Sequence, residues 1–112
     1  MNNYLNLLGL ATRARSTVSG ETLIKGIQSK NVCFVVIALD ASENAKKKIT
    51  DKCQYYGVDY VLIGDTVSIS RAIGKYNRVA VGITNAGFAK KIKDEIGGWF
   101  YGKTKQKEKR CT

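Results

Sequence analysis

The chain is predicted to fold as an α/β three-layer α/β/α sandwich, with about four strands in a mostly parallel or mixed sheet and five helices around it. Segments rich in β-branched residues alternate along the chain with segments whose apolar residues recur at helical spacing. The strand-like segments are apolar on both faces, as in strands that helices cover on each side. The length of 112 residues suits one domain, for which we expect residues 1–102, followed by a basic and disordered tail at 103–112.

Two helices are expected before the first long strand. Residues 3–14 carry apolar residues at helical spacing, and residues 16–18 are long enough for only a very short strand. The second helix opens near Ser19, whose hydroxyl is of a type that commonly caps a helix N-terminus. The inward face of this helix consists of Leu23, Ile24 and Ile27.

The middle of the chain predicts two strands with a helix between them. Residues 32–39 form a continuous β-prone run that reads as a strand buried on both faces. A helix follows residues 40–42 and ends at Gly57. Residues 60–63 form the second buried strand. Lysines cover much of the exposed surface of the intervening helix: Lys46, Lys47, Lys48 and Lys52.

A short helix, a strand and a last helix complete the predicted fold. Asp65 or Thr66 caps the short helix, which Gly74 ends in a left-handed conformation. Residues 79–83 form a third strong strand. Asn85 caps the last helix, and glycines at 97 and 98 end it. The inward side chains of this helix are Phe88, Ala89, Ile92 and Ile96.

The formal net charge of +10 indicates a polyanionic partner, with nucleic acid ahead of an anionic membrane surface. No apolar run approaches the roughly 20 residues of a membrane-spanning helix. The N-terminus lacks the pattern of a secretory signal, so we expect a cytoplasmic protein. Three cysteines without a C-x-x-C pair, and no histidine, argue against a zinc site and fit free thiols in a reducing cytosol.

Residues for catalysis are missing from the sequence. General acid–base catalysis most often uses histidine, and the chain has none. Gly74 and Lys75 resemble the end of a phosphate-binding loop, but Ile69 stands where its first glycine belongs and Tyr76 where it has serine or threonine. We therefore expect a non-enzymatic protein that needs no cofactor and no metal.

Three turns carry chemistry that suits an RNA backbone and its exposed bases. The first turn opens the second helix, where free N–H groups and a glycine favour a phosphate. Its candidate residues are Ser19, Gly20, Glu21, Thr22 and, one turn later, Lys25. The second turn contributes Asp40 and Ser42. The third turn combines a glycine, cations and an aromatic side chain: Ile73, Gly74, Lys75, Tyr76, Asn77 and Arg78. An ordinary capped helix and solvated loops are the alternative interpretation.

Three segments occur in the order and spacing of a known family, namely residues 18–25, 35–42 and 70–75. They resemble the kink-turn-binding ribosomal protein family, which has the L-thirty-e-like fold. Residues 5–11 and 87–92 resemble its bacterial YlxQ-type branch more closely. The resemblance implies binding of structured RNA with a kinked internal loop, and ribosomal RNA is the first expected ligand. The ribosome or its assembly intermediates are then the expected partners of a monomer that makes no membrane contact.

In that family the second helix begins with glycine, any residue, asparagine, glutamate and, three residues later, lysine. The resemblance places four residues at these positions: Ser19, Glu21, Thr22 and Lys25. Lys25 matches the pattern, whereas an ionised Glu21 only accepts hydrogen bonds where asparagine both donates and accepts. The specificity loop of the family corresponds to residues 73–76, with Lys75 at a position that usually holds a small aliphatic residue.

Three other interpretations remain open. The fold also resembles the small substrate-recognition domain of certain RNA 2′-O-methyltransferases. A regulatory domain that receives a phosphoryl group would need clustered acids at the strand ends, where only Asp40 and Asp65 are available. A protein–protein adaptor is the third interpretation, against which the net charge and the lysines of the third helix favour RNA.

Overall fold

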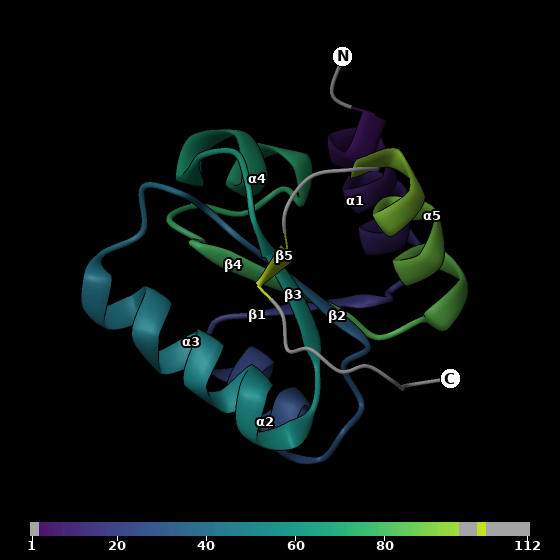
Figure 1. Ribbon diagram of the computed structural model, residues 1–112. Helices are drawn as coiled ribbons and strands as arrows, with labels where there is room; N and C mark the ends of the chain where they lie inside the picture. Colours follow the sequence, from purple (N-terminus) through teal and green to yellow (C-terminus); the bar gives the residue numbers. More distant parts are fainter. Residues whose placement is uncertain (1–2, 97–100, 103–112) are drawn as a thin grey trace.

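A five-stranded mixed sheet forms the middle layer of the fold (Figure 1), with strand order β1-β4-β2-β3-β5. The computed structural model describes residues 3–96 and 101–102. The strands are β1 Thr17–Ser19, β2 Phe34–Ile37, β3 Asp59–Leu62, β4 Ala80–Ile83 and β5 Tyr101–Gly102. The helices are α1 Asn3–Arg13, α2 Glu21–Gln28, α3 Glu43–Tyr56, α4 Thr66–Ala72 and α5 Ala86–Ile96. The predicted tail at 103–112 and the predicted stop at 97–98 lie outside the described residues.

Helices cover both faces of the sheet, with α2 and α3 on one side and α1, α4 and α5 on the other (Figure 1). Alternate residues of β2 enter two separate cores. Phe34 and Val36 pack toward α1, α4 and α5, whereas Val35 and Ile37 pack toward α2 and α3. The predicted three-layer sandwich, and the burial of this strand on both faces, are therefore confirmed.

The directions of the strands make the sheet mixed rather than mostly parallel. β2 pairs parallel to β3, whereas β4 runs antiparallel to both of its neighbours, β1 and β2. Ile37 at the end of β2 pairs with Leu62 at the end of β3 and with Ala80 at the start of β4. The chain thus leaves β3 and enters β4 at the same end of the sheet. Residues 63–79, which include α4, therefore return the chain to the end of the sheet that it left, and β4 runs antiparallel to β2.

Side-chain caps start three of the helices. The hydroxyl of Ser42 accepts the N–H of Ala45 at 3.1 Å, and the carboxylate of Asp65 accepts the N–H of Ser68 at 3.1 Å. Asn85 accepts the N–H of Phe88 at 3.1 Å. The predicted caps of the last two helices are therefore confirmed, with Asp65 rather than Thr66 as the cap of α4.

The predicted cap at Ser19 is wrong. Ser19 is the last residue of β1 and pairs with Val81 of β4. The N-cap position of α2 is Gly20, and no side chain bonds to the start of the helix there. The hydroxyl of Thr22 instead donates to the carbonyl of Ser19 at 2.9 Å. Ser19 belongs to the paired part of β1, so the helix starts one residue later and Ser19 is not at its N-cap position.

Cys53 is a core residue on the inward face of α3. It lies among the side chains between α2, α3 and the sheet. Burial, with a smaller contribution from the charge of Asp59, raises the pKa of the Cys53 thiol to about 12. Within residues 3–96 and 101–102, no helix is long and apolar enough to cross a membrane.

Candidate nucleic-acid interface

One end of the sheet collects the three predicted turns. The first turn follows Ser19, which pairs with Val81 near the start of β4. The second turn follows Ile37, the last residue of β2, which pairs with Ala80. The third turn, at residues 73–78, leads directly into β4. Strand pairing therefore brings together three segments that lie far apart in the sequence.

Gly20 and Arg78 join the first turn to the third. A Cβ atom added to Gly20 would lie 3.3 Å from Nη1 of Arg78, so the guanidinium group packs against the start of α2. Gly20 has φ 66° and ψ −140°, a backbone conformation that is essentially restricted to glycine. The position therefore needs glycine both for its backbone and for the space that Arg78 occupies.

The backbone of Arg78 is held in place while part of its side chain lacks a partner. The hydroxyl of Ser70 accepts the N–H of Arg78 at 2.8 Å and donates to its carbonyl at 3.2 Å. The Nε atom of Arg78 is buried and has no hydrogen-bond partner among the described residues. Because the residue as a whole is only partly buried, its guanidinium group beside Gly20 can offer N–H groups to a phosphate or a base edge.

Three of the first-turn candidates lie together on the surface of α2. Glu21, Thr22 and Lys25 are all exposed, and the spacings of three and four residues put them on one face of the helix. Lys25 forms no ion pair with any residue that the structure describes. This face therefore presents a cation, a hydroxyl and a carboxylate to solvent.

The two candidates of the second turn make structural hydrogen bonds. Thr66 donates its hydroxyl at 2.7 Å and its backbone N–H at 2.9 Å to one carboxylate oxygen of Asp40. These bonds, the one from the hydroxyl above all, hold the pKa of Asp40 below its ordinary value. Ser42 caps α3, as described above. Asp40 thereby links the second turn to the start of α4. The neighbouring Leu39 is 53% exposed.

The third turn borders a groove of about 410 Å³ between itself and α4. Its lining residues are Thr66, Val67, Ser70, Arg71, Gly74, Lys75, Tyr76 and Asn77. The ring of Tyr76 is 88% exposed. Gly74 has φ 71°, which confirms its predicted left-handed conformation. The groove thus combines cations with an aromatic face that is open to solvent.

The structure separates Ile73 from the other candidates of the third turn. Ile73 is 5% exposed and packs into the core beneath α1, α4 and α5. Conversely, Arg71 and Thr66 lie at this surface, although the sequence does not mark them as candidate site residues. Arg78 belongs to the predicted third turn, and the structure adds that its side chain packs against Gly20 in the first turn.

The side chains of this surface are of the kinds that contact polyanions. Its cations come from three elements of the chain, and its hydrogen-bonding groups include both donors and acceptors. In the part of the chain that the structure describes, no three histidine, cysteine or acidic side chains gather as metal ligands would.

A sequence model of the ribosomal protein L7Ae/L30e/S12e/Gadd45 family matches residues 3–93. The chain belongs to this family. The resemblance drawn above from residues 18–25, 35–42 and 70–75 is thereby confirmed. All three segments, and with them the three turns, lie within the matched part of this ribosomal L7Ae family domain.

Two relatives in this family cover most of the chain. The RNA-binding protein YlxQ of Bacillus subtilis is 49% identical over 90 residues, which make up 80% of this chain and 90% of that protein. The RNA-binding protein YlxQ of Enterococcus faecium is 44% identical over 95 residues, or 84% of this chain and 91% of that protein. Similarity to the YlxQ branch, as the sequence predicts, is therefore confirmed.

Solved structures share the L7Ae-like fold. A Bacillus halodurans protein of unknown function superposes with a TM-score of 0.81 and 39% identity, covering 86% of this chain and 98% of that one. The Giardia lamblia 15.5-kD RNA-binding protein superposes with a TM-score of 0.68 and 21% identity, covering 83% of this chain and 81% of that one. The second likeness concerns the fold alone.

Proposed function

We propose that the protein binds structured RNA, without catalysing a reaction, through the end of the sheet where the three turns meet. This three-turn surface is formed by residues 19–25, 39–42 and 74–78, apart from the buried Leu23 and Ala41. The observation that carries the proposal is the packing of Arg78 against Gly20. It makes one continuous surface of the start of α2 and the basic third turn.

The side chains of the three-turn surface match the parts of an RNA internal loop. Lys25, Lys75 and Arg78 supply cations for phosphates, which fix position without reading sequence. Glu21 accepts hydrogen bonds from base amino and imino groups. Tyr76 offers an exposed ring for an unstacked base, and such stacking is worth about 1–3 kcal/mol per base.

The shape of the surface favours a bent or bulged RNA. Three turns at one end of a sheet make a compact surface rather than a long groove that follows a single strand. Protein side chains read RNA sequence mainly where unstacked bases are splayed out of a helix. We therefore expect the ligand to be an internal loop, with a kinked loop in ribosomal RNA as the first candidate.

Membership of the ribosomal L7Ae family supports this proposal, as do the names of the YlxQ relatives, which describe them as RNA-binding. The proposed setting is cytoplasmic, with a monomer acting on the ribosome or its assembly intermediates. The proposal does not extend to a standard kink-turn, because Glu21 and Lys75 differ from the family's usual residues at the contact positions.

Equilibrium affinities for three RNAs at one physiological salt concentration test the proposal. The RNAs are a kinked internal loop between two stems, a perfect duplex with the same stems, and a single strand of the same composition. We expect the internal loop to bind roughly tenfold more tightly than the others, as one good base contact would give. Equal affinities would leave only a non-specific basic surface, and tightest binding to the single strand would contradict the shape argument.

A further inference from the structure

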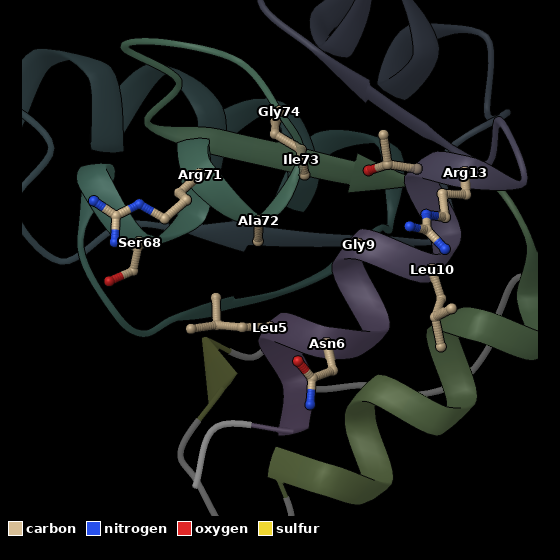
Figure 2. Close-up of a pocket in the computed structure, with 11 residues that line it drawn as sticks. Leu5, Asn6, Gly9, Leu10, Arg13, Ser68, Arg71, Ala72, Ile73 and Gly74 are labelled. Atoms are coloured by element: carbon tan, nitrogen blue, oxygen red, sulfur yellow. The ribbon is translucent and has the colours of Figure 1, made fainter.

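A second groove, larger than the one at the third turn, separates α1 from α4 (Figure 2). It has a volume of about 790 Å³. Gly9 and Ala72 let the two helices approach at its floor, where a Cβ atom on Gly9 would lie 3.2 Å from the carbonyl oxygen of Ala72. Leu10 remains 50% exposed. We call this feature the α1–α4 groove.

The charged residues that line the α1–α4 groove are all arginines. Figure 2 shows Arg71 on α4 and Arg13 at the end of α1, on opposite sides of the groove. Both are exposed, and neither forms an ion pair among the described residues. The polar residues beside them carry no charge: Asn6, Thr12 and Ser68. The groove therefore offers hydrogen-bond donors and positive charge, with no carboxylate on its lining to repel a phosphate.

The α1–α4 groove is continuous with the three-turn surface. Arg71 and Gly74 line both this groove and the groove beside the third turn. An RNA held at the third turn thus meets the α1–α4 groove directly past Gly74. This continuity favours RNA over a separate protein partner as the occupant.

We infer that the α1–α4 groove holds the phosphate backbone of a stem that flanks the internal loop, with Arg13 and Arg71 as its phosphate contacts. This inference rests on the proposed function and adds a second part to the interface. The three-turn surface binds the internal loop, and the α1–α4 groove binds the stem where the stem is long enough to reach it. Affinity should therefore depend on stem length through Arg13 but not through Lys25.

The test compares an internal-loop RNA with short stems against the same RNA with one stem, or the other, extended. Wild-type protein should gain affinity when one particular stem is extended. Arg13→Ala should bind that extended RNA about threefold more weakly, as removal of one exposed ionic contact predicts, and bind the short RNA as wild type does. Arg13→Lys, which keeps the charge, should restore the gain. Lys90→Ala is the matched control, since this exposed α5 lysine lines neither groove.

With the extended RNA, Arg13→Ala should also make the negative slope of log affinity against log salt concentration shallower by about 0.9. An equal effect on both RNAs, or none, would overturn the inference, and the absence of any effect would favour an acidic protein segment as occupant. Lys25→Ala separates this failure from failure of the proposed function. If Lys25→Ala weakens binding and Arg13→Ala does not, the proposed function stands and the inference falls. If wild-type protein prefers a single strand or a duplex, both fall.

Discussion

The contact between Gly20 and Arg78 connects the first turn to the third. The sequence marks Gly20 as a place where a phosphate can approach closely, and the structure adds that Arg78 packs against it. Such a contact between distant residues depends on strand pairing, which local patterns do not report. For the same reason Ser19, a good capping residue by type, is taken up by β1.

Gly20→Ala should lower both stability and RNA affinity. Alanine is strained at the backbone angles of Gly20, which should lower the free energy of unfolding by about 1–3 kcal/mol. It would also displace the guanidinium group of Arg78. Denaturant unfolding and RNA titration measure the two effects.

Gly57→Ala is the control for this prediction. Gly57 also has a positive φ, of 72°, but a Cβ atom there would meet nothing within 4 Å. We expect this variant to lose stability and to keep the RNA affinity of wild type. If Gly20→Ala bound RNA as tightly as Gly57→Ala does, the pair of Gly20 and Arg78 would not belong to the interface.

Lys25→Ala should weaken binding of an internal-loop RNA about fivefold, since an exposed ionic contact is worth up to about 1 kcal/mol. Its side chain is exposed on α2, so the substitution should leave the fold intact. The negative slope of log affinity against log salt concentration should become shallower by about 1. Lys90→Ala removes the same charge from α5 and should change RNA affinity far less. Equal losses of affinity in the two variants would show that Lys25 contributes only through the overall positive charge of the protein.

At the scale of elements, periodicity and capping residues locate most helices and strands. The five predicted helices and four predicted strands are present, because each carries its own local pattern. β5 is the exception, since its two residues hold no pattern and depend on pairing with β3. The antiparallel direction of β4 is a property of its pairing with β1 and β2, which the alternation of elements along the chain does not reveal.

The hydrogen bonds between Asp40 and Thr66 predict a pH-dependent link between two elements. The pKa of Asp40 is lower in the folded protein than its ordinary value of 3.8. The link therefore stabilises the fold above that ordinary value, and its contribution is lost as the pH falls through the lower folded-state pKa.

Asp40→Asn should melt at a lower temperature than wild type at about pH 7, where an unpaired carboxyl is ionised. The difference should close as the pH falls below 3.8. Thermal unfolding across this range measures it, with Asp51→Asn as control. Asp51 pairs at 3.6 Å with Lys47 on the surface of α3, and such an exposed pair contributes little. A difference between Asp40→Asn and wild type that did not change with pH would exclude a role for the Asp40 charge.

At the scale of the whole molecule, charge is the property that the sequence reports most directly. Ten net positive charges indicate a polyanion, but they do not show where it binds. The candidate residues were predicted from local chemistry, and the fold places most of them at one end of the sheet. Ile73 lies in the core instead, since its spacing from Ile69 makes it part of the inward face of the chain around α4.

Removal of residues 103–112 should weaken binding to all RNAs by similar factors. This segment has five cations and one acid, so it carries a large share of the net charge. Cations that contact phosphates add affinity without reading bases. The affinities of the three RNAs described above should therefore keep their order in the truncated protein; a changed order would show that this segment contributes to specificity.

The central claim is that RNA covers the three turns together. Amide hydrogen exchange of the protein, free and bound to an internal-loop RNA, tests it residue by residue. We expect RNA to slow exchange within residues 19–25, 39–42 and 74–78 at once, and to leave the exposed face of α5 unchanged. Slowed exchange confined to one turn, or to α3 or α5, would contradict the claim.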